Sequence, residues 1–373
     1  MSSKLKYADI FCGCGGLTYG FNKNKLFEGV LGVDYSGPAG DVYLSNFPNI
    51  PFWNLDLQET ENVSKVIKHL SNNCDVLLGG PPCQGFSTLG KRSSFDIRSQ
   101  LIDVYLKIVN KVNPSFIIME NVKGIRSMRY SADQTYPEHI KSSLCRKYTL
   151  TELMLDASDF GMAQTRVRYI LVGVKKGLKM QMTVQEAIES QVSKYKKTLL
   201  DVIGDLPQID AGGGGDIIID NTFKSKKIYN HKAMKHSPSL IERLSHVPVG
   251  GGLQDVPRNL LNDHLINMLN GKYGSGGHAK NIYGRLDWNK PAGTIVAGID
   301  KVTCGRFVHP TSHRLLTPRE CARIQSFSDD FIFSGSLVAQ YYMIGNAVPP
   351  KWSSVFSNMI TKIKGRYESN CIL

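Results

Sequence analysis

The chain has 373 residues, and its composition excludes several classes of protein. Hydrophobic residues make up 42% of it, which is enough for a sizeable core and argues against wholesale disorder. Lysine and arginine outnumber aspartate and glutamate by 45 to 32, and the resulting net charge of +13 favours a polyanionic partner such as nucleic acid. The N-terminus has no apolar signal region and no apolar run approaches the length of a membrane span, so we expect neither secretion nor membrane insertion.

The eight cysteines are spread along the chain without paired spacing. Neither a metal-binding pattern nor the framework of a disulfide-rich secreted domain is recognisable in them. We therefore expect reduced thiols in a cytoplasmic protein that holds no metal.

The first half of the chain alternates between strand and helix patterns. Strands are expected at 7–11, 29–33, 75–78, 116–119 and 169–174, and helices from about residue 17 and at 42–47, 63–70 and 101–112. Such alternation predicts an α/β fold with a doubly wound, Rossmann-like sheet.

The composition shifts after about Gly177. Lysine-rich stretches and the glycine runs 212–215, 250–252 and 274–277 indicate a smaller, loop-rich second module. Helical patterns return at 318–327, 337–344 and 352–363. We expect a first domain over 1–185, a second over 186–312, and a segment over 313–373 that returns to the first domain.

A glycine-rich turn follows the first strand, in the sequence Asp9-Ile-Phe-Cys-Gly-Cys-Gly-Gly16. A strand that runs through such a turn into a helix outlines a nucleotide-cofactor pocket. Asp34, at the end of the next strand, is placed to bind ribose hydroxyls. At this point a hydride-transfer cofactor fits the pattern as well as any other.

The stretch Gly79-Gly-Pro-Pro-Cys83-Gln-Gly-Phe-Ser87 follows an apolar strand. Two prolines make the turn stiff and two glycines allow a close approach, so the turn can present the Cys83 thiol to a substrate. The alternative is a tight turn that contains a small buried cysteine.

Two further segments carry charge at strand ends. Glu120 follows the strand 116–119, where it is either a helix-capping group or a functional acid. Arg166 and Arg168, in Gln164-Thr-Arg-Val-Arg, fall on one face of an extended segment. They suit an anion or a base carbonyl, or they form a solvated strand end.

Two motifs near the C-terminus indicate local structure. Thr317, Pro318 and Glu320 together predict a capped helix start, which we interpret as mainly structural. The sequence Gly345-Asn-Ala-Val-Pro-Pro350 predicts a turn between two helices.

Taken in order, these motifs closely resemble the series found in the DNA cytosine-5 methyltransferases: the glycine turn, Pro-Pro-Cys-Gln, Glu-Asn-Val, Gln-x-Arg-x-Arg, Arg-x-Leu-Thr-x-Arg-Glu and Gly-Asn-x-Val-Pro-Pro. The resemblance covers about 1–177 and 283–364. The region between them matches loosely, as is expected of a variable target-recognition region.

The resemblance implies a catalytic set of Cys83, Glu120, Arg168 and, in support, Arg166. Cys83 would add to carbon 6 of a cytosine flipped out of duplex DNA, which makes carbon 5 nucleophilic. Glu120 would bind ring nitrogen 3 and the exocyclic amine, and Arg168 the base carbonyl. Contacts to DNA would come from Ser87, Arg98, Gln164 and Thr294, with the lysine- and glycine-rich residues 178–312 reading the sequence.

The resemblance also implies S-adenosylmethionine as cofactor. Asp34 would bind its ribose, although the family more often has glutamate there, and Tyr35 and Asp56 would lie near the adenine. Cys12 and Cys14 are unusual in the glycine turn and are interpreted as small space-fillers. The remaining residues expected to line the pocket are Phe11, Gly13, Gly15, Gly80, Pro82, Leu101, Asn346 and Ala347.

The leading hypothesis is a sequence-specific DNA methyltransferase of a bacterial or phage restriction-modification system, cytoplasmic and associated with the nucleoid. We expect a monomer, with double-stranded DNA as partner and a cognate restriction endonuclease as a genetic rather than a physical partner. One alternative is a related enzyme that methylates tRNA. Another is a catalytically inactive DNA-binding regulator, against which the intact Cys83, Glu120 and Arg168 argue.

Overall fold

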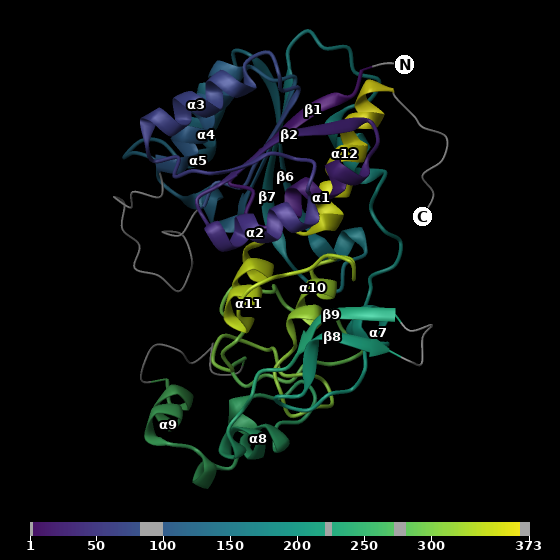
Figure 1. The fold of residues 1–373 in the computed structure, drawn as a ribbon. Helices are drawn as coiled ribbons and strands as arrows, with labels where there is room; N and C mark the ends of the chain where they lie inside the picture. Colours follow the sequence, from purple (N-terminus) through teal and green to yellow (C-terminus); the bar gives the residue numbers. More distant parts are fainter. Residues whose placement is uncertain (1–2, 83–99, 221–225, 272–280, 366–373) are drawn as a thin grey trace. The chain divides into compact units, whose positions relative to one another are not determined.

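The computed structural model describes residues 3–82, 100–220, 226–271 and 281–365 (Figure 1). The chain divides into two compact units, and each is described by itself. The first comprises residues 1–156, 167–193 and 347–373, and the second comprises 157–166 and 194–346.

The first unit is built on a seven-stranded sheet with the strand order β3-β2-β1-β4-β5-β7-β6. Five neighbouring strands are parallel, whereas β7 runs antiparallel to both β5 and β6. The strands are β1 (Leu5–Ile10), β2 (Phe27–Asp34), β3 (Phe52–Asn54), β4 (Val76–Gly79), β5 (Phe116–Val122), β6 (Tyr148–Asp156) and β7 (Val167–Lys175).

Helices cover both faces of this sheet, as the alternating pattern predicted (Figure 1). One group packs together on one face: α3 (Thr60–Leu70), α4 (Gln100–Val112) and α5 (Tyr136–Leu144). A second group includes α1 (Gly16–Lys23), α6 (Val184–Glu189) and α12 (Pro350–Lys364), and α2 (Gly37–Asn46) lies beside β2 and β3. The expected doubly wound α/β fold is confirmed.

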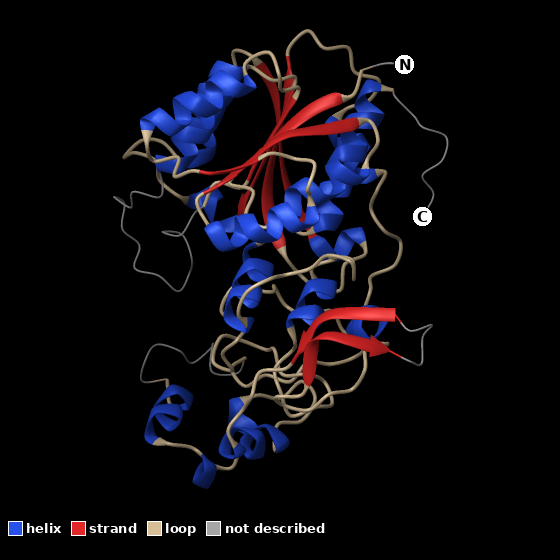
Figure 2. Cartoon of the chain, viewed as in Figure 1, coloured by secondary structure: helices blue, strands red, loops and turns tan. Residues whose placement is uncertain are grey.

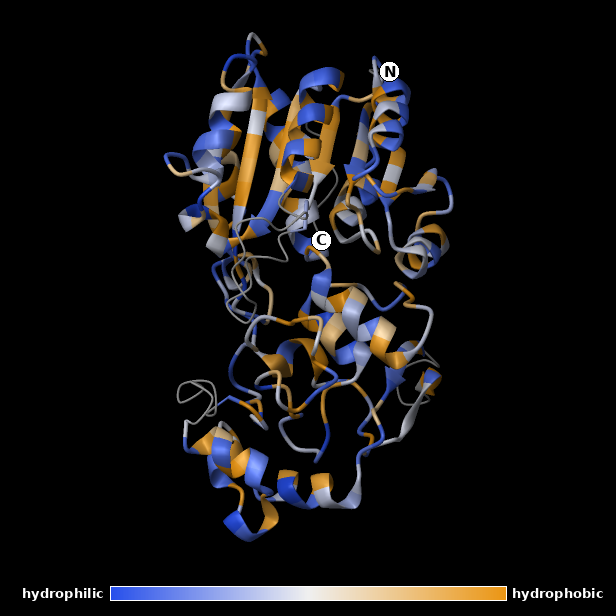
Figure 3. Ribbon diagram, turned by 90° about the vertical axis from the view of Figure 1, so that its left-hand side faces the viewer, coloured by the Kyte–Doolittle hydropathy of each residue, from blue (hydrophilic) through white to orange (hydrophobic). Residues whose placement is uncertain are grey.

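The core lies between the sheet and these helices. The central strands are predominantly apolar, as the orange colour in Figure 3 shows, because a parallel sheet with both faces covered buries both sets of side chains.

The sheet has a topological switch point between β1 and β4. Ile10, the last residue of β1, pairs with Val33 of β2 on one side and with Gly79 of β4 on the other. The loops after β1 and β4 therefore diverge at the carboxyl edge of the sheet. In open α/β sheets this crevice is where ligands bind.

The second unit is mostly irregular chain, in agreement with the loop-rich module expected from its composition (Figure 2). Its regular elements are α7 (Leu199–Ile203), the hairpin of β8 (Gly214–Asp220) and β9 (Lys226–Lys232), α8 (Pro238–Ser245), α9 (Asp263–Leu269), α10 (Pro318–Ile324) and α11 (Leu337–Asn346).

The boundary of the second unit differs from the expected one. Residues 313–346 belong to the second unit, and the chain returns to the first only at 347. Buried arginines explain the difference: Arg314 Nε donates to the carbonyl of Ile209 at 2.8 Å, and Arg319 Nε donates to that of Tyr229 at 2.7 Å. Of the three C-terminal helices, only α12 packs in the first unit.

Among the described residues, no helix is long and apolar enough to cross a membrane.

Candidate functional site

The turn after β1 leaves the carboxyl edge of the sheet at the switch point. Phe11, Gly13 and Gly15 all have positive φ, at 62°, 53° and 94°, so the backbone turns sharply before α1 begins. A Cβ at Gly15 would lie 2.2 Å from the ring of Phe47, whereas a Cβ at Gly13 would meet no atom within 4 Å. Gly15 is therefore required for packing, and the space beside Gly13 is open.

Asp34, at the end of β2, faces this turn. Its carboxylate accepts the backbone N–H of Gly13 at 2.8 Å and that of Ser36 at 2.9 Å. Burial raises the pKa of Asp34, and these two hydrogen bonds oppose the rise. These hydrogen bonds hold the turn and the acid in one arrangement.

Asp9 lies beneath the same turn and has no role in the sequence-based expectations. It is fully buried, and its Oδ2 accepts the Thr18 hydroxyl at 2.7 Å, while Oδ1 has no hydrogen-bond partner among the described atoms. Burial raises the pKa of Asp9 to about 7. In the sequence, the position of Asp9 at the start of the glycine-turn motif was the only indication of a role near the turn.

Cys12 and Cys14 are buried free thiols. Burial raises the pKa of Cys14 to about 12 and that of Cys12 well above its usual value. A thiol with so high a pKa is a poor nucleophile and a poor metal ligand at neutral pH, which supports the interpretation of both as space-fillers.

The turn after β4 leaves the same edge of the sheet on the other side of the switch point. Gly79 packs against Tyr105, whose ring would lie 2.4 Å from a Cβ at position 79. Asn121 Nδ2 donates to the carbonyl of Pro81 at 3.2 Å, and Asn121 Oδ1 accepts the N–H of Val122 at 2.8 Å. Asn121 therefore holds the start of the turn that leads to position 83. Cys83, Ser87 and Arg98 lie outside the described residues.

Glu120 and Arg168 form an ion pair beside this turn. They lie on the paired strands β5 and β7, where Glu120 is opposite Ile170 and Arg168 is opposite Val122. Arg168 Nε lies 3.2 Å from Glu120 Oε1, and the two side chains are only 15% and 12% exposed. A Cβ at Gly80 would be 3.9 Å from Glu120 Oε2, so this carboxylate oxygen lies close to the turn that continues to Cys83.

Other residues expected at the cofactor pocket are placed as follows. Ala347 lies beside Gly16, and Val348, which the sequence did not single out, approaches both Gly16 and Gly80. Tyr35 is 65% exposed. The others are the partly buried Phe11 and Pro82, the buried Leu101 on α4, and the exposed Asp56, whose Oδ1 accepts the N–H of Gln58.

Four expected site residues belong to the second unit: Gln164, Arg166, Thr294 and Asn346. Arg166 is buried, and its Nη1 donates to the carbonyls of Ile295 and Gly345 at 3.1 and 3.4 Å. The Thr294 hydroxyl donates to the carbonyl of Thr165 at 3.0 Å. These bonds join segment 164–166, segment 294–295 and the end of α11, where Asn346 lies exposed.

Gln164 was expected to contact DNA, but the structure places it in the interior of the second unit. Its side chain is fully buried and donates to Gln325 Oε1 at 2.6 Å, and its Oε1 accepts the N–H of Ile295 at 3.3 Å. Gln325 in turn donates to the carbonyl of Ile344 at 2.8 Å. Gln164 and Gln325 therefore hold neighbouring segments together. A contact between Gln164 and DNA stays a prediction, which this buried placement does not favour.

Gly345→Ala is expected to lower the free energy of unfolding by about 1–3 kcal/mol, because overpacking forces the backbone to move. A Cβ at position 345 would lie 2.2 Å from the carbonyl carbon of Val296. Gly293→Ala is the matched control, since a Cβ there meets no atom within 4 Å. Denaturant unfolding of the two variants measures the difference, and equal stability would show that α11 is not docked on this segment.

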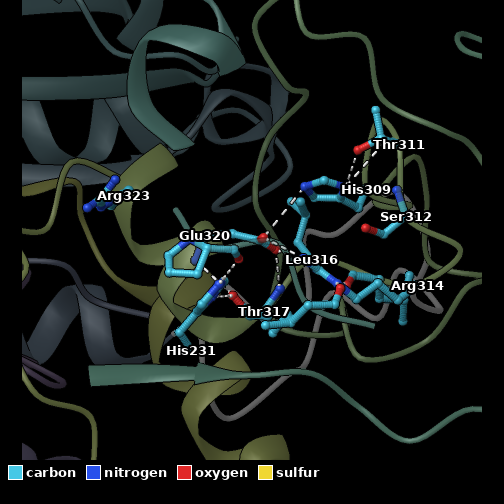
Figure 4. Close-up of polar contacts among 12 residues, drawn as sticks. His231, His309, Thr311, Ser312, Arg314, Leu316, Thr317, Glu320 and Arg323 are labelled. Carbon is cyan, nitrogen blue, oxygen red and sulfur yellow. Dashed lines mark hydrogen bonds and ion pairs between the residues drawn. The ribbon is translucent and has the colours of Figure 1, made fainter. Parts of the chain in front are cut away.

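A buried polar cluster stabilises the start of α10 (Figure 4). Glu320 accepts both guanidinium Nη atoms of Arg314 at 2.8 Å and the N–H of Thr317 at 2.7 Å, within a capping box. His309 Nε2 lies 3.7 Å from Glu320 Oε1, and His231 Nδ1 lies 2.9 Å from the Thr317 hydroxyl. The mainly structural role expected for this motif agrees with these contacts.

Acid is expected to destabilise the protein through this cluster. Arg314 holds the pKa of Glu320 at about 2 against the effect of burial, and burial lowers the pKa of His309 to about 4. Unfolded histidine takes up a proton near pH 6.5, so stability falls as the pH falls from 6.5 to 4, by about 3 kcal/mol for His309 alone. Glu320 adds a further loss between its unfolded pKa near 4.5 and pH 2.

Denaturant unfolding measured from pH 7 to pH 4 checks this expectation. The His309→Asn variant should show a flatter dependence on pH, because an amide takes up no proton in this range. His246→Asn, at an exposed histidine, is the control and should keep the slope of the original protein. A slope unchanged by His309→Asn would contradict the assignment.

No group of three or more histidine, cysteine, aspartate or glutamate side chains that could hold a metal ion occurs in the described part of the chain.

Comparison with known proteins identifies the family of the chain. A sequence model of the C-5 cytosine-specific DNA methylases matches residues 5–363. The Type II methyltransferase M1.HphI of Haemophilus parahaemolyticus is 32% identical over 363 residues, covering 96% of this chain and 87% of that protein. The Type II methyltransferase M.DdeI of Desulfomicrobium norvegicum is 30% identical and covers 96% of this chain and 88% of its own.

Solved structures show the same fold. A DNA modification methyltransferase encoded within an E. coli prophage superposes with a TM-score of 0.75 at 24% identity, covering 97% of this chain and 100% of that one. The Dnmt2 methyltransferase of S. pombe gives a TM-score of 0.61 at 17% identity, covering 96% and 97%. The chain belongs to the C-5 cytosine-specific DNA methylase family.

Proposed function

We propose that this protein methylates carbon 5 of a flipped-out cytosine in duplex DNA through a covalent bond to Cys83, as the modification enzyme of a restriction-modification system. The observation that carries the proposal is the Glu120–Arg168 pair, partly buried beside the turn that continues to Cys83. A nucleophile, an acid and a cation at one sheet edge are the groups that this chemistry needs.

The reaction begins with addition of the Cys83 thiolate to carbon 6 of the cytosine. The bond formed there pushes electrons toward ring nitrogen 3, where Glu120 supplies a proton or a strong hydrogen bond. The resulting enamine is nucleophilic at carbon 5, which would take the methyl group as the sulfur–methyl bond of S-adenosylmethionine breaks, with S-adenosylhomocysteine as the product. A base then removes the carbon 5 proton, and the thiolate leaves.

Arg168 has two functions in this scheme. Its guanidinium orients Glu120 through the ion pair and offers N–H donors to the carbonyl of the base. Arg166 is a positioning residue, because its described bonds go to backbone carbonyls of the second unit. Asn121 supports Cys83 by fixing the carbonyl of Pro81.

S-adenosylmethionine supplies the methyl group in this family, and the first unit fits it. Asp34 is held at the end of β2 with the turn, and the space beside Gly13 is open. Asp34 would bind the ribose hydroxyls, and Tyr35 and Asp56 the adenine. The proposed wall in the first unit consists of Phe11, Gly15, Gly80, Pro82, Leu101 and Ala347.

Asp34→Ala is expected to raise the Kd for S-adenosylmethionine by about 10- to 100-fold, which corresponds to losing charge-assisted hydrogen bonds. Calorimetric titration of the cofactor measures this. Asp41→Ala on α2, an exposed aspartate of the same unit, is the control. Unchanged affinity in the Asp34 variant would remove Asp34 from the pocket.

We further propose that the second unit reads the DNA sequence and that Ser87, Arg98 and Thr294 contact DNA near the flipped base. The enzyme is proposed to act as a monomer beside a cognate endonuclease in the same cell.

The test compares substrates. Purified protein with S-adenosylmethionine that carries a labelled methyl group is given duplex DNA or tRNA at equal nucleotide concentration. Label in DNA alone is expected. Label in tRNA alone would replace the proposed function with its nearest alternative, and label in neither would favour an inactive DNA-binding protein.

A further inference from the structure

The first unit carries a cluster of basic residues at the edge of the sheet opposite to Glu120. Three segments that contain no aspartate or glutamate, 107–119, 139–151 and 172–185, contribute to it. We call the cluster the basic edge; its members are Lys107, Lys111, Lys141, Arg146, Lys147, Lys175, Lys176 and Lys179.

Hydrogen bonds show that the three segments lie side by side. Lys147 Nζ donates to the carbonyl of Asn110 at 2.8 Å, at the end of α4. The N–H of Lys176 donates to the carbonyl of Lys147 at 2.9 Å, and Lys175 Nζ donates to that of Asn113 at 3.3 Å. All members are exposed except Lys175, which is half-buried.

Helix capping accounts for part of the cluster only. Lys147 and Lys175 bond to carbonyls at the end of α4, where a cation is favourable. The other six make no ion pair with a carboxylate among the described residues. The acids that contact the three segments bond to other groups: Asp103 Oδ1 lies 2.6 Å from His139 Nε2, Glu186 accepts the N–H of Thr183 at 2.8 Å, and the backbone carbonyl of Asp75 accepts the N–H of Phe116.

We infer that the basic edge binds the phosphates of double-stranded DNA at a second place, apart from the catalytic edge. Arg168 and Lys175 are seven residues apart on β7, which separates the two edges by about 23 Å. The surface offers charge without an extended apolar patch. Within its three segments, Met180 is the only large apolar side chain that is exposed among the described residues. Such a surface suits the sugar–phosphate backbone, which is bound by charge and carries no sequence information.

A stable protein interface usually has an apolar core, and anchoring of an amphipathic surface in a membrane uses apolar side chains. DNA requires neither, and the enzyme meets it as substrate. A second contact would hold a long molecule while the catalytic edge searches it, so it should matter for long DNA and not for a short duplex.

The test removes four charges. The basic-edge variant combines four substitutions: Lys111→Gln, Arg146→Gln, Lys176→Gln and Lys179→Gln. The control variant loses the same charge at exposed positions of the same unit and combines Lys23→Gln, Lys25→Gln, Lys65→Gln and Lys68→Gln. Affinity for duplex DNA of several hundred base pairs is measured against salt concentration. Each lost phosphate contact reduces the slope of log K against log salt by about 0.9, so a reduction of about 2–4 is expected for the first variant only.

Methylation separates this inference from the proposed function. A 20-base-pair duplex that carries the recognition sequence should be methylated within twofold of the original rate by both variants, whereas long DNA at 0.2 M salt should be methylated at least tenfold more slowly by the basic-edge variant. Equal salt slopes in the two variants, or an equal loss on the short duplex, would overturn the inference. Absence of methylation by the unaltered protein would instead refute the proposed function.

A second measurement reports on the site directly. Acetylation of surface lysines, followed by mass spectrometry, should show Lys111, Lys176 and Lys179 protected by long duplex DNA, with Lys65 and Lys68 unprotected. Equal protection of both sets would contradict a localised site.

Discussion

The Glu120→Gln variant is expected to lower kcat for DNA methylation by about 10²- to 10⁴-fold, the range associated with losing a general acid. Glutamine keeps the size of the side chain but donates no acidic proton to ring nitrogen 3. It also removes the negative partner of Arg168, which lies 3.2 Å from the carboxylate. Single-turnover methylation of saturating duplex DNA measures the chemical step.

Glu28→Gln is the control, because Glu28 is an exposed acid on β2 of the same sheet and should leave kcat unchanged. Binding of DNA by the Glu120 variant should change far less than kcat. A Glu120→Gln enzyme with more than a tenth of the original kcat would show that this carboxylate is not the acid of the reaction.

The Cys83→Ala variant is expected to lose methylation by about 10⁴-fold or more, because removing a nucleophile eliminates the covalent route. Duplex DNA that contains 5-fluorocytosine offers a direct readout, since the fluorine blocks removal of the group at carbon 5. The unaltered enzyme should remain covalently attached to such DNA, and the variant should not.

Cys145→Ala serves as the control, because Cys145 is an exposed free thiol outside the site. It should keep both activity and adduct formation. Retention of the adduct in the Cys83 variant would mean that another residue attacks the base.

The architecture of the first unit followed from local patterns. Apolar runs and glycine turns predicted the doubly wound sheet, and the rule that ligands bind at the carboxyl edge placed Glu120 there. Register confirms this placement, since Ile10 and Gly79 end adjacent strands and Met119 pairs with Gly79.

Elements with weak patterns were not predicted. β6 lies at the end of the sheet, and its exposed and buried residues follow no clean alternation. α5 has a complete capping box at Thr135, but it is short and largely polar. In both cases packing against neighbours decides the structure, and a single sequence does not show those neighbours.

Contacts between residues that are far apart in the sequence could not be predicted either. The resemblance implied that Gln164 contacts DNA, yet its side chain is buried and its partner Gln325 is 161 residues away. Val348 and Asp9 lie near the cofactor turn because of packing and burial, which a single sequence does not show. The chain returns to the first unit only at residue 347 because Arg314 and Arg319 bond to the distant carbonyls of Ile209 and Tyr229 in the second unit.

Methylation of cytosine through Cys83 is tested by bisulfite sequencing of DNA from cells that express the protein, with the Cys83→Ala variant expressed in parallel. We expect protected cytosines at one short recurring sequence in cells with the unaltered protein and none with the variant. Absence of protected cytosines in both, or equal protection in both, would contradict this expectation.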